Sequence, residues 1–256
     1  MSAEIDDRRE MTLRAKLSLP EDAAPAWSLL SALLSACVLL VCLVLVGPAL
    51  ASLLLGSQEI TPFLLMLSWA LGMGLCLIYL GVSRRSNAES WAALRLGPGH
   101  LPRPLVLLLG VAIALAADLV VNLGSGEFQP VPEIYGFNSG GAANLLLAAL
   151  LLILLQPLAE SLVFQAMLLP SLRWRLGPWL GVFVASGLFV ARHLLVFWAA
   201  YADIYKLAWH GLAYPALTGL AFCLLRVYTG SSSSVIIARM AAGLIFFLTA
   251  LAVSGA

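Results

Sequence analysis

Charged residues are scarce in this sequence, because Lys, Arg, Asp and Glu together make up 11% of its 256 residues. Hydrophobic residues make up 62%, far from the roughly half-apolar and quarter-charged mixture of soluble globular proteins. This imbalance excludes an ordinary soluble domain and indicates an integral membrane protein in a lipid bilayer. The formal net charge of +1 gives no indication of nucleic-acid binding, and we expect no nucleic-acid partner.

Cysteine is also sparse, and its four positions show no metal-ligand or redox spacing. All four lie in apolar runs, so we expect small buried residues and no disulfide framework. They are Cys37, Cys42, Cys76 and Cys223. We also expect no cleavable signal peptide, because the first apolar run is too long for one.

Seven apolar runs of roughly 20 residues follow a polar tail at residues 1–26, and each can cross about 30 Å of hydrocarbon. In lipid such runs form helices, because backbone groups without internal partners cannot be solvated there. The sequence therefore predicts an all-α polytopic membrane helix bundle, with residues 27–256 as a single transmembrane domain. The expected spans lie near residues 27–54, 60–82, 104–123, 143–169, 179–200, 207–227 and 234–253.

The basic residues between these spans favour one side of the membrane. One set of connections carries nearly all of them, whereas the alternate connections carry only Lys206. This pattern predicts a cytoplasmic N-terminus and an outside C-terminus, and we expect a bacterial inner membrane. The long loop from Gly124 to Gly141 then lies outside. The cytoplasmic set is Arg8, Arg9, Arg14, Lys16, Arg84, Arg85, Arg95, Arg103, Arg173, Arg175 and Arg226.

Five polar residues lie inside the predicted spans, namely Asp118, Glu160, Arg192, His193 and Arg239. Each ionised group near the bilayer centre opposes insertion by roughly 2.5 to 3.5 kcal/mol, so the two acids and two arginines are expected to pair. Asp118 and Arg192 lie at similar depths of about 20 Å from the cytoplasmic ends of their helices, which predicts that they pair with each other. A lone His193 is more often a hydrogen-bonded structural residue than a functional one.

Glu160 is the residue around which we interpret the site. It lies in an apolar stretch, residues 156–170, and acids inside a membrane are by default functional. Pro157 precedes it, removes one backbone donor and favours a kink beside the acid. The alternative is a polar residue tolerated in a helix interface.

The order of these residues resembles the CPBP family, the CAAX-type and bacteriocin-processing intramembrane endopeptidases. Glu160 lies in PLAESLVFQ, Phe189 and His193 lie in SGLFVARH, and a later helix ends in RVYTGSSSSVII. The resemblance covers roughly residues 143–247, with a weaker echo, WAALRLG, at 91–97. Members carry EExxxR, then FxxxH, then HxxxN or HxxxD. The resemblance implies that the first Glu and the two His activate water for peptide cleavage, while the Asn helps to stabilise the oxyanion.

The match to these motifs is partial. Glu160, Phe189 and His193 fit, but Ser161 and Gln165 replace the second Glu and the Arg. These two positions are four apart, so on an α-helix they share a face, and a Ser with a Gln can still hydrogen-bond there. At the third motif Arg239 replaces the His and Gly243 replaces the Asn or Asp.

The change at Arg239 affects the chemistry most, because a guanidinium stays protonated and cannot act as a base or bind a metal. His210 is a conceivable substitute, but it lies at the opposite end of the sixth predicted helix from the turn preceding Arg239. With one His and one carboxylate as ligands, we expect no metal and no cofactor. We also expect Arg239 to pair directly with Glu160 in bidentate geometry, which would leave the carboxylate a poor base.

These observations favour a non-proteolytic descendant that binds a membrane protein or a lipid-anchored segment in the former active-site cavity. The alternative is an active endopeptidase. In that case Glu160 activates water, His193 orients it or transfers its proton, and Arg239 stabilises the oxyanion. A transporter subunit is a third class, supported only by the intramembrane charges. Phe189, Gln165, Ser161, Gly243, Arg192 and Asp118 are the expected binding residues around this set.

Overall fold

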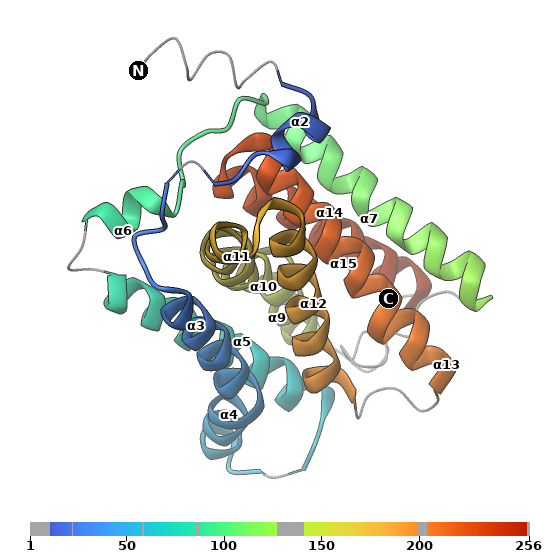
Figure 1. Cartoon of the computed structure of the whole chain (residues 1–256). Helices are drawn as coiled ribbons and strands as arrows, with labels where there is room; N and C mark the ends of the chain where they lie inside the picture. The colour runs from blue at the N-terminus through green and yellow to red at the C-terminus, as the bar shows by residue number, and fades with distance from the viewer. Residues whose placement is uncertain are drawn as a thin grey trace.

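The computed structural model describes residues 11–254 except 22, 58, 85–87, 127–140 and 199–203. Within these ranges every regular element is helical and there is no strand. Seven helices are long and apolar enough to cross a membrane, as judged by length and composition (Figure 1). The predicted all-α, polytopic membrane bundle is therefore confirmed.

The seven spans are each built from one helix or from several consecutive helical segments. The first comprises α3 (Leu29–Val41), η1 (Cys42–Val46) and α4 (Gly47–Leu55). The second and third are α5 (Pro62–Arg84) and α7 (Arg103–Ser125). The fourth comprises α9 (Ala142–Ala149), η2 (Leu150–Leu155), α10 (Gln156–Glu160), η3 (Ser161–Leu168) and α11 (Leu169–Leu176). The last three are α12 (Pro178–Phe197), then α13 (Ile204–Lys206) with η5 (Leu207–Ala213) and α14 (Tyr214–Thr229), then α15 (Ser232–Ser254). Outside them lie α2 (Leu13–Ser18) and α6 (Ala88–Ala93).

Four prolines account for the four π-helical segments η1, η2, η3 and η5. Each segment ends two residues before a proline, namely Pro48, Pro157, Pro170 or Pro215. The proline ring crowds the carbonyl four residues earlier and supplies no N–H to it. In each case the residue just before the proline donates instead to the carbonyl five residues back, as Gln156 does to Leu151. The backbone thereby stays hydrogen-bonded, as a lipid environment requires.

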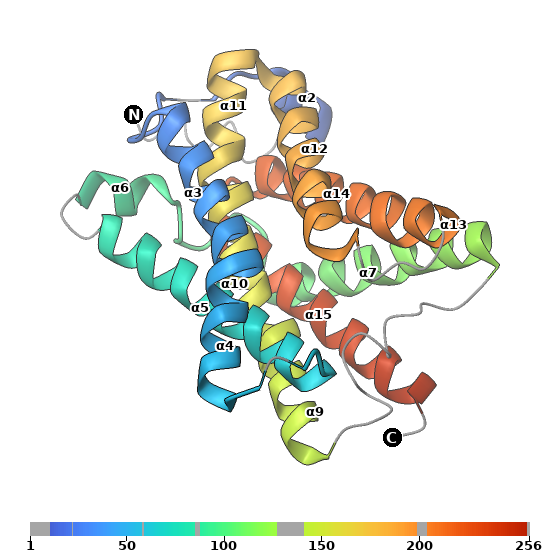
Figure 2. The same cartoon turned by 90° about the horizontal axis from the view of Figure 1, so that it is seen from below.

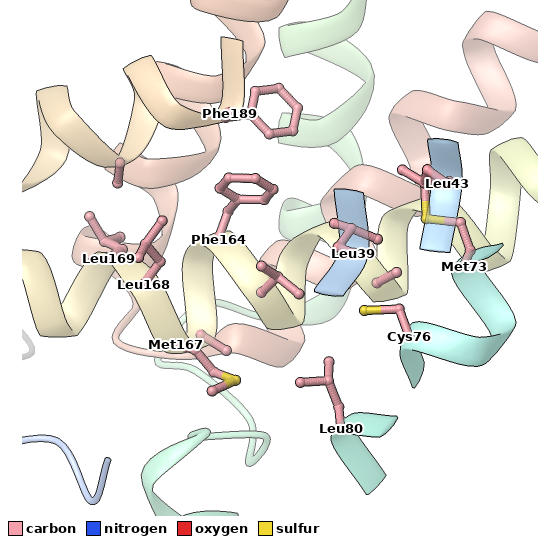
Figure 3. Close-up of a cluster of buried hydrophobic side chains, with 14 of the residues drawn as sticks. Leu39, Leu43, Met73, Cys76, Leu80, Phe164, Met167, Leu168, Leu169 and Phe189 are labelled. Atoms are coloured by element: carbon pink, nitrogen blue, oxygen red, sulfur yellow. The ribbon is translucent and has the colours of Figure 1, made fainter. Parts of the chain in front are cut away.

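The fourth span is the central element of the bundle. Figure 2 shows α9, α10 and α11 following one another along one long helix, and Figure 1 shows it surrounded by the other spans. It contacts α3, α5, α12, α14 and α15. Its residues dominate the buried apolar cluster in Figure 3, where Phe164, Met167, Leu168 and Leu169 lie against side chains from α3, η1, α5 and α12. Glu160 itself is buried, on a helix that contacts five others.

The described part of the N-terminal tail is held against the bundle. The indole Nε1 of Trp27 donates to the carbonyl of Met167 at 3.2 Å and to Oγ of Ser171 at 3.0 Å. Leu17 of α2 is buried, and α2 packs on α14 and α12. This segment lies on the surface of the protein, as expected for so charged a sequence, but it is tied to the fourth span.

The segment WAALRLG and the run of four serines pack on each other. Oγ of Ser231 and Oγ of Ser233 donate to the carbonyl of Gly97, at 2.6 and 2.8 Å, and the backbone N–H of Ser232 donates to the carbonyl of Arg95 at 2.9 Å. These serines lie at the start of α15, so their hydrogen bonds join that start to the connection between α6 and α7. The run of four serines thus holds two parts of the chain together.

The cysteine prediction needs one correction. Cys42, Cys76 and Cys223 are buried and free, but Cys37 is exposed on α3, because that face of the first span points away from the bundle. The predicted outer loop, Gly124 to Gly141, lies largely outside the described residues. The division into a tail and a single transmembrane domain stays a prediction.

The orientation in the membrane also stays a prediction, and cysteine labelling tests it. In a Cys37→Ala background, Ala142→Cys should react with an impermeant maleimide in intact cells, and Leu96→Cys should react only after permeabilisation. Both positions are exposed at opposite ends of the spans. The reverse pattern would overturn the orientation inferred from the basic residues.

Candidate functional site

The carboxylate of Glu160 is buried and shared between two arginines. Only 1% of the residue is exposed. Its Oε1 accepts a short hydrogen bond from Nη2 of Arg192 on α12. Its Oε2 accepts from Nη2 of Arg239 on α15 at 2.7 Å. The predicted pair between Glu160 and Arg239 is present, and the guanidinium of Arg192, expected near this site but paired with Asp118, shares the same carboxylate.

Arg239 does not hold Glu160 in the expected bidentate geometry. Its Nη2 donates to Glu160, whereas its Nη1 donates to Oε1 of Gln165 at 3.3 Å. Gln165 lies five residues after Glu160, and in an α-helix the two would point in different directions. In the π-helical segment η3, the residue at i+5 lies about one turn above residue i, so one guanidinium reaches both.

The hydrogen bond expected between Ser161 and Gln165 is absent. Both side chains are fully buried, and within the described residues Oγ of Ser161 has no hydrogen-bond partner. The expectation assumed an α-helical face, but η3 has a different register. The pair of positions that carries opposite charges in the CPBP motif is here neutral, and only Gln165 contacts the charged cluster.

Phe189 separates the two arginines from the apolar core. The guanidinium carbons of Arg192 and Arg239 lie 5.1 and 4.7 Å from the centre of its ring, close enough for cation–π attraction. Its ring also meets Phe164 edge to face, with centroids 5.3 Å apart, as Figure 3 shows. A Cβ at position 219 would come within 2.8 Å of this ring, so Gly219 on α14 makes room for it.

His193 lies next to this cluster. Its ring centroid is 4.8 Å from that of Phe189. It follows Arg192 on α12, and Arg192 donates to Glu160. His210 is buried on η5, at the other end of the sixth span from the turn before Arg239.

The predicted pair between Asp118 and Arg192 is wrong. Arg192 donates to Glu160 instead. Asp118 lies on α7, which packs on α15, α14 and η5, whereas α12 packs chiefly on α11 and α14. Equal depth placed the two residues at the same level of the bundle, but on helices that do not face each other.

Gly243 is a point of close helix contact. A Cβ added there would lie 2.1 Å from the carbonyl oxygen of Leu152 on η2. Real Cβ atoms do not approach backbone this closely, so any larger residue requires α15 and η2 to move apart. The CPBP motif has Asn or Asp at this position. In this chain the backbone of η2 occupies the space where such a side chain would begin.

The cluster carries one more positive charge than negative, because two guanidiniums share one carboxylate. The cavity that borders Arg192 has a volume of about 10 Å³, which is enough for one water at most. Among the described residues no three or more His, Cys, Asp or Glu side chains gather where they could hold a metal. The arrangement orients the carboxylate of Glu160 between two guanidiniums and buries it, with 1% of the residue exposed.

Comparison with known proteins supports the resemblance inferred from the motifs. Residues 142–245 match a family model described as Type II CAAX prenyl endopeptidase Rce1-like. No curated protein and no solved structure matches the chain. The matched segment includes Glu160, Phe189, His193 and Arg239, so the predicted resemblance to CAAX-type proteases is confirmed there. The protein is a multi-pass membrane protein, and its residues 142–245 are similar to the Rce1-like family.

Sequence reasoning missed two features of the site. Arg192 was assigned to the wrong acid, although its place beside His193 in the second motif put it next to the expected site. Phe222 of α14 was not considered, yet its ring lies 5.0 Å from the guanidinium carbon of Arg239. A signal for the first was available, because Arg192 lies three residues after Phe189, and residues three apart share a helix face.

Proposed function

We propose that this protein is a non-proteolytic relative of the CAAX-type endopeptidases that binds a membrane-protein or lipid-anchored partner without cleaving it. The observation that carries the proposal is the state of Glu160, whose two oxygens are each occupied by a guanidinium. A general base must reach the proton that it removes, and Glu160 is 1% exposed with a guanidinium hydrogen-bonded to each oxygen, which opposes the approach of a reacting water.

The other two motif positions support the same proposal. Arg239 keeps its proton and has no acceptor atom, so it cannot replace a histidine base. Gly243 provides no side-chain donor for an oxyanion, and its Cα lies against the backbone of η2. We place the protein in the bacterial inner membrane with a cytoplasmic N-terminus, on the strength of the basic residues between the spans.

We expect the partner to bind on the lipid-facing surface of the bundle and not beside Glu160. The space beside Arg192 is too small for a peptide segment, so the former active site does not provide a groove there. The seven spans carry exposed Leu, Val and Ile side chains in the part of the bundle that faces lipid. A transmembrane or lipid-anchored partner would meet this apolar surface inside the bilayer.

A cleavage assay tests the non-proteolytic part of the proposal. The purified full-length protein is incubated with prenylated and unprenylated CAAX peptides, beside Glu160→Ala as the matched control. We expect no cleavage above the level of Glu160→Ala with either peptide. Cleavage that Glu160→Ala abolishes would reject the proposal and establish the endopeptidase, with the two arginines stabilising the oxyanion.

The partner part of the proposal is tested by crosslinking in the native membrane. A photoreactive residue at the exposed position Leu108 of α7, inside the third span, should crosslink to a protein with a transmembrane helix or a lipid anchor. The same residue at the exposed position Leu96, outside the spans, serves as control. Crosslinks from Leu96 alone would contradict a partner held within the bilayer.

A further inference from the structure

A second site lies where several spans begin or end, and none of the residues that hold Glu160 lines it. A cavity of about 440 Å³ is bounded there by α2 and the chain after it, by residues 95–100, by the first turns of α11 and by the turn between α14 and α15. The third and seventh spans begin at this end, while the fourth and sixth end there. The cavity therefore lies at the level of the lipid headgroups.

The lining of this cavity is strongly basic. Lys16, Arg95, Arg173 and Arg226 line it, and among the described lining residues Glu21 is the one acid. Glu21 is already shared, since its carboxylate lies 3.5 Å from Nη1 of Arg95 and 3.3 Å from Nε of Arg173. The described lining residues therefore carry an excess of three positive charges, which a bound anion would balance.

Arg226 is the member of this set that most needs a further hydrogen-bond acceptor, because it is 4% exposed and only partly hydrogen-bonded. Its Nε donates to Oγ of Ser232 at 3.0 Å. Within the described part of the protein its two Nη groups have no hydrogen-bond acceptor. A buried guanidinium normally has acceptors for its donors, and leaving them unmet is costly. Four N–H donors in a planar fork thus remain available at the wall of the cavity.

Arg173 and Lys16 differ in how many of their donors are already hydrogen-bonded. Arg173 is fully engaged, with Nη2 donating to the carbonyl of Leu19 at 2.7 Å, so it serves to fix the chain after α2. Lys16 donates to the carbonyl of Tyr228 at 3.0 Å and keeps further donors on its ammonium group. Burial lowers the pKa of Lys16 from its ordinary value, and an anion beside it would oppose that effect.

We infer that this cavity binds a phosphate group at the membrane surface. The fork of Arg226 matches two oxygens of a tetrahedral phosphate, and Lys16 of α2 adds a point charge to the lining of the cavity. The volume suits a headgroup-sized ligand. The phosphate can belong to an anionic lipid, which the depth of the cavity favours, or to a soluble molecule that enters from water.

The test uses the full-length protein in detergent and follows its thermal unfolding. Three probes are titrated at constant ionic strength, namely dihexanoyl phosphatidic acid, dihexanoyl phosphatidylcholine and inorganic phosphate. We expect saturable stabilisation by phosphatidic acid, since a ligand that binds only the folded state raises Tm. Stabilisation by phosphatidic acid alone identifies a lipid ligand, and equal stabilisation by inorganic phosphate identifies a soluble one. No saturable shift with either overturns the inference.

Variants link the shift to the cavity. Arg226→Gln should raise the apparent Kd by about tenfold or more, because a bidentate charged contact is lost. Arg226→Lys should recover part of the lost affinity. Lys16→Gln, on a short surface helix, should weaken it severalfold and serves if Arg226→Gln does not fold. Arg175→Gln is the matched control, because Arg175 is exposed on the last turn of α11 and does not line the cavity. An unchanged Kd in both Arg226→Gln and Lys16→Gln, or an equal loss in Arg175→Gln, overturns the inference.

Discussion

Glu160→Leu is expected to destabilise the folded protein by about 3–5 kcal/mol, more than the loss of either arginine beside it. The reason is the charge balance of the cluster. Without Glu160, the buried guanidiniums of Arg192 and Arg239 are left near each other with no acid between them. Without Arg239, the pair of Glu160 and Arg192 remains and is neutral. The second guanidinium thus reverses the expectation, drawn from a simple pair, that removing Arg239 strands the acid.

The measurement is the free energy of unfolding in one detergent for Glu160→Leu, Arg239→Leu and the double variant. The double variant leaves one unpaired cation rather than two, so it should be more stable than Glu160→Leu alone. Arg103→Leu is the control, because Arg103 is exposed at the start of α7, and its replacement should change stability by less than about 0.5 kcal/mol. Equal losses from Glu160→Leu and Arg239→Leu would show that the carboxylate is not shared as the structure has it.

The seven spans and the meeting of Glu160 with Arg239 were both predictable from the sequence. Hydropathy over about 20 residues reports burial in lipid directly, so the expected spans agree with the observed ones to within a few residues at most ends. The fourth span is the exception, since it continues to Leu176 rather than ending near residue 169. Its last turns carry Arg173, whose hydrogen bonds to Leu19 and Pro178 satisfy it inside the protein.

The partner of Arg192 could not be predicted from depth, because depth along a helix does not say which neighbour that helix faces. Asp118 and Arg192 are at similar heights, but α7 lies against α15, and α12 lies against α11 and α14. The assignment of neighbours depends on close contacts such as that at Gly243, which only the three-dimensional packing shows.

The π-helical register of the fourth span could have been predicted from the prolines in the sequence, but it was not. Pro157 indicated a kink beside Glu160, but the same argument applies to Pro170, whose missing N–H shifts the preceding turns to the π-helical register. That shift brings Gln165 to the side of Glu160 and turns Ser161 away from it. Just before a proline inside a predicted span, residues five apart as well as four apart should therefore be considered as sharing a helix face.

Gly243→Ala is expected to destabilise the protein by about 1–3 kcal/mol, although alanine is the better helix former at an ordinary position. The added methyl group would lie 2.1 Å from the carbonyl oxygen of Leu152, and backbone cannot rotate away as a flexible side chain can. Gly187→Ala on α12 is the matched control. A Cβ there meets nothing within 4 Å, so helix propensity acts alone and stability should stay equal or rise by up to about 1 kcal/mol.

The same contact decides whether the third CPBP motif can be restored. Arg239→His combined with Gly243→Asn rebuilds HxxxN, but the Asn side chain begins at the Cβ position that η2 already occupies. We therefore expect this double variant to unfold at a lower temperature than Arg239→His alone and to cleave no prenylated peptide. Unfolding is measured by thermal denaturation in detergent and cleavage with the CAAX peptides. A double variant as stable as Arg239→His would show that α15 and η2 can separate at this point. The difference from the HxxxN motif would then be a matter of two side chains rather than of helix packing.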